Sequence, residues 1–303
     1  MGRFPLLGTL SPHGFLPAHL AVAVLLVILA APHVTPALSW ANGTYCTSSA
    51  PGNTFGTHDW IAYHALDFLP SAEKFYILDN NLTYLCATEL PDHGIGDTAN
   101  HHVYYYRNGS LQDDASAARA QAFYEQLVGD LESGNFSGAA MAAAVMSHYI
   151  ADVGVFGHVM GASTDWGAEV HHADYEDYVL ARTDGVDAPF NSYLTFDGSL
   201  STSNARTLTL ALAFDTTFDS SGAGRNATWM DSSYDWSNQA FKDRAGQSLN
   251  NAVNAVADAL HSAFIAGGSP IPEFPQISLP LVLASSATVA LLLERRLRQA
   301  DSG

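Results

Sequence analysis

Two histidine–carboxylate pairs stand at helical spacing in the middle of the sequence. His148 precedes Asp152 by four residues, His172 precedes Glu176 by the same interval, and His158 lies between the pairs. Residues four apart lie on one face of an α-helix, so each pair can offer an imidazole nitrogen and a carboxylate oxygen to one ion. Zinc favours this mixture of ligands. The pairs therefore predict a centre with more than one metal ion, which is suited to the hydrolysis of a phosphate ester.

Other candidate ligands lie earlier in the chain, and each also has an ordinary structural interpretation. His58 stands where a helix is expected to start, and Asp92 and His102 lie in a loop rich in glycine, aspartate and asparagine. The His172–Glu176 pair alone is also compatible with a charge pair on a helix surface. Four further side chains are close enough in the sequence to replace a named ligand: His93, Asp97, His101 and His171.

Helical periodicity dominates the sequence and predicts an all-α fold. The alanine-rich stretch 138–151 is almost entirely apolar, as expected for a central buried helix that carries His148. Between 236 and 266, apolar residues recur at spacings of three or four. The other expected elements are helices over 59–69 and 116–133, stretches at 192–196 and 207–213 that are ambiguous between strand and helix, and a loop over 216–233.

The two ends of the chain differ in composition from this helical region. An apolar run followed by small residues is typical of a secretory signal peptide, which predicts residues 1–39 as the signal and cleavage before Trp40. Residues 272–303 combine a proline-rich entry, an apolar run and several arginines, and are expected to form a transmembrane anchor rather than a buried core helix. The region 40–271 is long enough for one domain. We therefore expect an extracellular protein attached to the cell surface.

Charge and cysteine content agree with an extracellular domain. Between 40 and 271 there are two lysines and six arginines against 27 acidic residues, so no polybasic surface and no stable nucleic-acid partner are expected. The only cysteines, Cys46 and Cys86, both follow the expected cleavage site, and an oxidising compartment favours a disulfide between them. Five Asn-x-Ser/Thr triplets are compatible with glycosylation, at Asn42, Asn81, Asn108, Asn135 and Asn226.

Four stretches of the chain resemble the zinc-dependent phospholipase C family, which includes bacterial phosphatidylcholine-preferring enzymes and clostridial alpha-toxin. The stretches are THDWI at 57–61, HVYYYRNG at 102–109, SHYIAD at 147–152 followed by His158, and HHADYE at 171–176. The resemblance extends roughly from Trp40 to Glu176 and is most specific in its last third. It implies a multi-helix bundle with phosphodiesterase activity on phospholipids.

The resemblance also implies three zinc ions and a role for each ligand. The implied ligands are Asp92, His102, His148 and Asp152 for one ion; Asp152, His58 and the α-amino and carbonyl groups of Trp40 for a second; and His158, His172 and Glu176 for the third. Because only cleavage before Trp40 creates that amine, activity would depend on export. In the implied reaction a metal-activated water attacks phosphorus, and Asp92 orients or deprotonates this water.

Two alternative functions remain open. The related S1/P1-type nucleases share the N-terminal tryptophan and the metal cluster, but their motif ends in His-x-x-x-Asp rather than the His-x-x-x-Glu found at 172–176. The second alternative is a metal-stabilised surface protein without turnover. The neighbours of Asp92 and His102 also lack the aromatic side chains that help to hold choline in the bacterial enzymes, which leaves the headgroup, and even another phosphodiester, open.

The C-terminal segment carries a resemblance of its own. The sequence PEFP at 272–275, the apolar run after it and the following arginines resemble the PEF-CTERM sorting signal of archaeal surface proteins. This resemblance implies processing by an archaeosortase, and a plain transmembrane anchor is the simpler interpretation. Both place the domain at 40–271 outside the cell.

Overall fold

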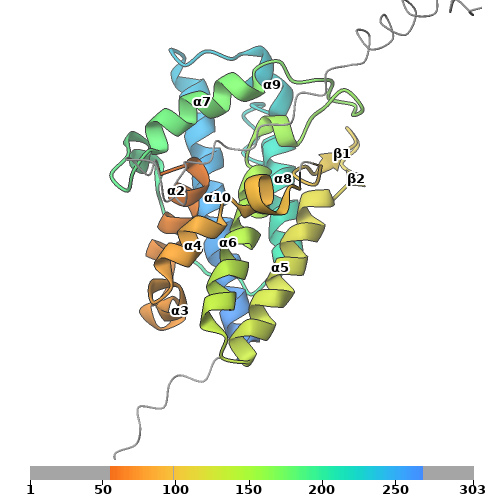
Figure 1. The fold of residues 1–303 in the computed structure, drawn as a ribbon. Coiled ribbons are helices and arrows are strands. Elements are labelled where there is room, and N and C mark those ends of the chain that lie inside the picture. Colours follow the sequence, from red (N-terminus) through yellow and green to blue (C-terminus); the bar gives the residue numbers. More distant parts are fainter. Residues whose placement is uncertain (1–54, 98, 269–303) are drawn as a thin grey trace, which may run out of the picture. The chain divides into compact units, whose positions relative to one another are not determined.

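The computed structural model describes residues 55–97 and 99–268, and these residues form a helical fold (Figure 1). The α-helices are α2 (Thr57–Ala65), α3 (Phe75–Leu78), α4 (Asn81–Ala87), α5 (Ala115–Glu132), α6 (Phe136–Asp152), α7 (His172–Thr183), α8 (Ala205–Phe218), α9 (Ala227–Ser232) and α10 (Gln239–Ala266). The shorter helical turns are η1 (Leu66–Phe68), η2 (Ser71–Glu73), η3 (Pro91–Ile95), η4 (Phe156–His158) and η5 (Pro189–Tyr193). Within the described residues, strands occur only in one antiparallel hairpin, β1 (Tyr104–Tyr105) and β2 (Leu111–Asp113). The prediction of an all-α fold is therefore confirmed for this part of the chain.

Helix α6 lies at the centre of the fold and packs against α2, α3, α4, α5, α8 and α10 (Figure 1). Its alanines have the highest helix propensity and let neighbouring helices approach closely. The side-chain oxygen of Asn135 caps the first turn by accepting a hydrogen bond from the Gly138 amide at 3.2 Å. Every residue from Ala142 to Asp152 is buried. Its last turn therefore carries His148 and Asp152 into the interior of the protein.

Helix α10 forms a second long support, packed against α2, α5, α6 and α8. It starts at Asn238, whose side-chain oxygen accepts a hydrogen bond from the Ala240 amide at 2.9 Å. Its apolar stripe includes Phe241, Leu249 and Val256, all fully buried. The helices expected over 59–69, 116–133, 138–151 and 236–266 correspond to α2 with η1, α5, α6 and α10.

The expectation of a loop over 216–233 is wrong in two places. Helix α8 continues to Phe218, and it also includes the ambiguous stretch 207–213. Helix α9 begins after Asn226, whose side chain accepts a hydrogen bond from the Trp229 amide at 2.9 Å. The polar composition of the segment is typical of a loop, which is why a loop was expected. The N-cap at Asn226 stabilises a helix there despite that composition. The other ambiguous stretch, 192–196, contains the end of η5, and its remaining residues are neither helix nor strand.

Several expectations concern residues that the structure does not describe. Trp40, Cys46, the signal segment 1–39 and the C-terminal segment 272–303 lie outside the described residues. Among 55–97 and 99–268, no helix combines the length and apolar character that a membrane span requires. Cys86 lies in α4, and its disulfide with Cys46, like the glycosylation sites and the anchor, stays a prediction.

Candidate metal centre

The last turn of α6 presents His148 and Asp152 to the same space. Both side chains are fully buried, and His148 Nε2 lies 3.4 Å from Asp152 Oδ2. His148 Nδ1–H donates to the Thr88 carbonyl at 2.7 Å, which fixes the ring and turns Nε2 toward Asp152. Burial, the strongest influence, lowers the pKa of His148 well below its usual value. The imidazole is therefore neutral at physiological pH, as a metal ligand must be.

The two oxygens of Asp152 face different histidines. Oδ1 lies 3.4 Å from His58 Nε2, whereas Oδ2 lies 2.7 Å from His101 Nδ1. Burial alone would raise the pKa of Asp152, but the charges and hydrogen bonds of the surrounding imidazoles outweigh it and hold the pKa well below its usual range. Asp152 is thus an ionised, buried carboxylate placed to bridge two neighbouring ions.

Asp92 completes the group on the Oδ2 side of Asp152. Its Oδ1 lies 3.7 Å from His148 Nε2 and 3.6 Å from His101 Nε2. Two overlapping sets, His58–His148–Asp152 and Asp92–His101–His148, each bring one donor atom per residue within 4.8 Å of the others. Burial and the charge of Asp152 raise the pKa of Asp92. Because bringing carboxylates together is costly without a compensating charge, the arrangement fits a bound cation.

The structure does not bring His102 into this group, and His101 takes the place expected for it. The His102 ring stacks on Tyr104 with centroids 4.2 Å apart, and its Nε2 lies 3.4 Å from Asp113 Oδ2. Residues 101–103 are neither helix nor strand, and the side chains of His101 and His102 point to different surroundings. Only His101, 5% exposed, points inward. From the sequence, His102 is the predicted ligand and His101 a candidate to replace it. Position in the sequence does not indicate which of two adjacent histidines points toward the core.

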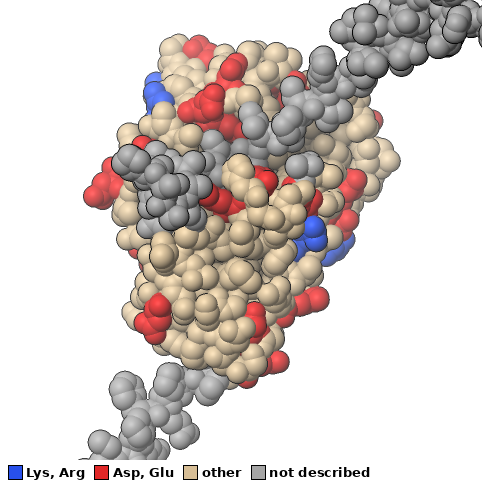
Figure 2. Space-filling model, viewed as in Figure 1, with Lys and Arg blue, Asp and Glu red and all other residues tan. Residues whose placement is uncertain are grey.

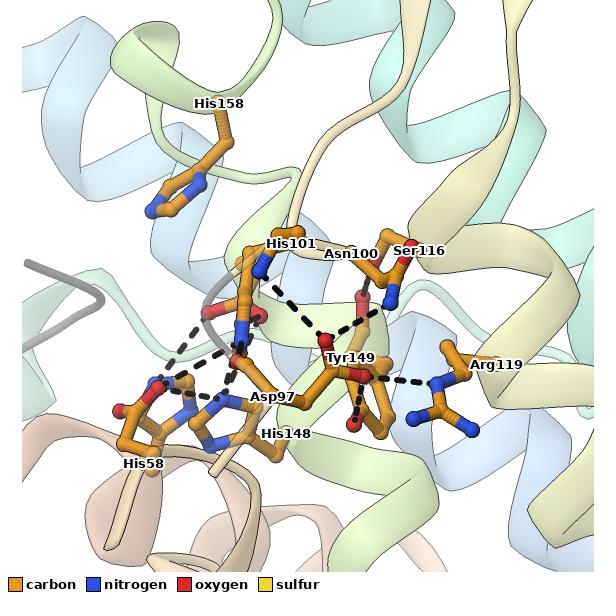
Figure 3. A network of polar contacts seen from close by, with 12 residues as sticks. His58, Asp97, Asn100, His101, Ser116, Arg119, His148, Tyr149 and His158 are labelled. Atoms are coloured by element: carbon orange, nitrogen blue, oxygen red, sulfur yellow. Dashed lines mark hydrogen bonds and ion pairs between the residues drawn. The ribbon is translucent and has the colours of Figure 1, made fainter. Parts of the chain in front are cut away.

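A third group consists of His158 on η4 together with His172 and Glu176 on α7. Glu176 Oε1 lies 2.9 Å from His172 Nε2 and 3.5 Å from His158 Nε2. Among the described residues, His158 Nε2 and Glu176 Oε2 are buried and have no hydrogen-bond partner. Buried polar atoms are normally satisfied, so an ion bound by this group would account for both. The His158 ring lies 6.4 Å from that of His101, which links the third group to the other two (Figure 3).

Two residues without ligand atoms of their own in the cluster position His172. A β-carbon on Gly157 would lie 2.4 Å from Cγ of the His172 ring, so the ring packs directly on the glycine backbone. Asp231 on α9 accepts hydrogen bonds from the amides of Val170 and His171 at 2.8 and 2.9 Å, and this holds the start of α7. Neither contact could be predicted from the sequence. Gly157 has no side chain that would indicate a role, and Asp231 is about 60 residues away from the amides that it binds.

The donor set fits zinc. Of the nine predicted ligands, the structure gathers His58, Asp92, His148, Asp152, His158, His172 and Glu176, adds His101, leaves His102 aside and does not describe Trp40. Imidazoles and carboxylates in groups of three or more are the ligands of zinc sites, and an additional donor or water completes the coordination. The ligands predicted for the second ion are Asp152, His58 and Trp40. The structure describes the first two of these and places His58 Nε2 3.4 Å from Asp152 Oδ1.

Two of these histidines bind a proton tightly when no ion is present. Burial lowers the pKa of His101, but the charge and hydrogen bond of Asp152 raise it to about 9. Burial likewise lowers the pKa of His172, but Glu169 and Glu176 raise it to about 10. Zinc must displace both protons, so we expect binding near neutral pH to release at least about two protons and to tighten as pH rises. Calorimetry in buffers of different ionisation enthalpy measures this number, and a value near zero would contradict the assigned ligands.

Comparison with known proteins gives a likeness of fold. No protein-family model and no curated protein matches the chain. Solved structures that it resembles include alpha-toxin from Clostridium absonum, with 16% identity and a TM-score of 0.47 over 74% of this chain and 66% of the toxin. Alpha-toxin from an avian strain of Clostridium perfringens is 14% identical in sequence, with a TM-score of 0.47. This match covers 71% of this chain and 65% of the toxin. The chain thus covers slightly less than two thirds of either toxin, and at these values the likeness carries no information on activity.

Proposed function

We propose that this protein is an exported zinc-dependent phosphodiester hydrolase that cleaves the headgroup from a phospholipid. The observation that carries the proposal is the buried Asp152 carboxylate, whose two oxygens face His58 on one side and His101 with His148 on the other. Ligand sets a few ångströms apart are characteristic of multi-metal phosphoesterases, in which the ions stabilise both the attacking and the leaving oxygen. Export and surface attachment are part of the proposal and derive from the sequence of the two ends.

The ligands divide among the ions as follows. Asp92, His101, His148 and Asp152 would hold the first ion, and Asp152 and His58, with the terminal amine of Trp40, the second. His158, His172 and Glu176 would hold the third. Bound zinc supplies a Lewis acid for the phosphate oxygens and lowers the pKa of a coordinated water toward neutrality.

Among the described residues of the cluster, Asp92 is the one best placed to take a proton from the attacking water. Its side chain is 19% exposed, whereas those of Asp152 and His148 are fully buried. Its raised pKa, caused by burial and by the charge of Asp152, moves it toward the range in which a carboxylate acts as a general base. Asp152, whose pKa is lowered, stays ionised and serves to hold metal.

The charge of the surface favours a phospholipid over a nucleic acid as substrate. The described residues contain few basic side chains, and acidic groups outnumber them on the face in Figure 2. Binding of a polyanion depends largely on Lys and Arg contacts with its phosphates, so a polynucleotide gains little from this surface. A single phosphodiester needs only the metal centre. The carboxylate at 176 is glutamate, as in the phospholipase form of the motif.

The proposal is tested by assaying the purified protein on phosphatidylcholine vesicles, other phospholipids, single-stranded nucleic acid and a chromogenic phosphodiester. We expect release of a phosphorylated headgroup that a chelator abolishes and added zinc restores. Nucleotide release without lipid cleavage would favour the nuclease alternative. Tightly bound zinc with no turnover of any substrate would favour a metal-stabilised surface protein, and activity that survives complete zinc removal would contradict the proposal.

A further inference from the structure

Of the two adjacent histidines His101 and His102, only His101 enters the cluster. Its Nδ1 lies 2.7 Å from Asp152 Oδ2 and 3.3 Å from His148 Nε2, so Nδ1 is the atom that faces the two ligands of α6, whereas Nε2 lies 3.6 Å from Asp92 Oδ1. For Nδ1 to coordinate a metal, the remaining proton of the neutral ring must sit on Nε2. The group that binds Nε2 therefore decides both the tautomer and the orientation of the ring.

That group is the backbone carbonyl of Asp97, which accepts a hydrogen bond from His101 Nε2 (Figure 3). A carbonyl has no proton to give, so the contact forms only when Nε2 carries one. The same bond favours the inward orientation of the ring, whereas His102 has its own contacts with Tyr104 and Asp113 outside the cluster. The position of the Asp97 backbone thus determines which nitrogen points at the ion.

The Asp97 backbone is in turn fixed by its side chain. Asp97 is 7% exposed, and its carboxylate accepts hydrogen bonds from Arg119 Nε at 2.7 Å, Tyr149 Oη at 3.0 Å and Asn100 Nδ2 at 2.7 Å (Figure 3). Arg119 lies on α5, and Tyr149 lies on α6 directly after His148. The loop that carries His101 is thereby fastened to the helix that carries His148 and Asp152. Metal-binding histidines are commonly oriented by a carbonyl or carboxylate on the second nitrogen.

We propose that Asp97, held by Arg119 and Tyr149, is the positioning residue that locks His101 in the Nε2-protonated tautomer and selects it over His102 as the ligand of the first ion. The inference rests on the proposed function only in requiring that this ion binds. It concerns a residue that touches neither substrate nor metal and acts entirely through His101.

Zinc affinity provides the first test. We expect Asp97→Ala, Arg119→Met and Tyr149→Phe each to lower the affinity for the first zinc ion by about 10–100-fold. This is the range found for residues that orient a metal ligand. His102→Ala is the matched control and should bind zinc as the wild type does. Arg119 is partly exposed, so its replacement leaves the core intact, and a melting curve of the metal-free protein checks this. Arg119→Lys keeps the charge and should recover part of the affinity.

Competition with a chromophoric chelator measures each affinity, and counting zinc per chain identifies how many ions are lost. The ion held by His158, His172 and Glu176 should keep its wild-type affinity in all of these variants, which a general loss of structure would not produce. Equal zinc affinity in Asp97→Ala, Arg119→Met and the wild type would overturn the proposal while leaving the proposed function in place. Absence of zinc binding by the wild type would overturn both.

The tautomer provides a second, independent test. In the zinc-loaded protein labelled with ¹⁵N-histidine, the signals of His101 are those missing from His101→Gln. Long-range ¹H–¹⁵N spectra should show a proton on Nε2 and a metal-bound Nδ1. Coordination through Nε2, with the proton on Nδ1, would overturn the proposal, as would signals of coordination that disappear in His102→Gln instead.

Discussion

Replacing His148 with alanine is expected to lower phosphodiesterase activity by at least about 1,000-fold. Its Nε2 lies 3.7 Å from Asp92 Oδ1 and 3.4 Å from Asp152 Oδ2 and is a ligand of the first ion, so the substitution removes one ion of the pair that shares Asp152. Loss of a catalytic metal withdraws several kcal/mol of transition-state stabilisation, and each 1.36 kcal/mol corresponds to a factor of ten in rate. Activity is measured on the substrate found for the wild type, and zinc per chain by elemental analysis.

The pattern of zinc loss makes this prediction specific. His148 belongs to neither the second nor the third ion, so the variant should lose about one ion and retain the ion of His158, His172 and Glu176 with wild-type affinity. His102→Ala removes a histidine of the same region that lies outside the cluster, and it should keep wild-type activity and zinc content. Unchanged zinc content in His148→Ala would contradict the assignment of this residue as a ligand.

Gly157→Ala is expected to remove the third ion and to reduce activity by about 10–100-fold, as loss of a residue that orients a ligand commonly does. The added β-carbon would come within 2.4 Å of the His172 ring, so the ring must leave its position beside His158 and Glu176. Zinc counting should then show the ions of the other two groups and a missing third. Retention of all zinc in this variant would mean that His172 is not held as the structure has it.

A glycine of the same chain supplies the control for this substitution. Gly129 is an exposed residue of α5, and a β-carbon there would meet nothing within 4 Å. Gly129→Ala should therefore leave zinc content and activity unchanged. Alanine loses less backbone entropy than glycine when a helix forms. The free energy of unfolding of this variant should therefore be about 0.5–1 kcal/mol higher than that of the wild type. Thermal unfolding of both variants distinguishes a local effect at His172 from a general effect of losing a glycine.

The sequence predicted most reliably those parts of the fold and site that depend on local pattern. The apolar, alanine-rich stretch that became α6 and the i,i+4 spacing of His148 and Asp152 together place two ligands on one buried helical face. The same reasoning placed His172 and Glu176 on α7. In each case the helix itself brings the pair together, so no knowledge of the tertiary structure is needed.

Features that depend on contacts between distant segments were not predictable in this way. The choice of His101 over His102 depends on the Asp97 carbonyl and on which side of the chain faces Asp152. The need for glycine at 157 arises from a ring that is supplied by α7. Helix α9 was missed because its N-cap, Asn226, lies in a segment whose composition is typical of a loop. Spacing along the chain carries no information on such pairings.

The most direct test of a metal cluster built around Asp152 is anomalous diffraction at the zinc absorption edge from crystals grown with zinc. The arrangement predicts one anomalous peak within bonding distance of Asp152 Oδ1 and His58, a second at Asp152 Oδ2 with His101 and His148, and a third between His158 and Glu176. Zinc-saturated crystals with no anomalous peak beside Asp152 would contradict the metal centre and the function proposed from it.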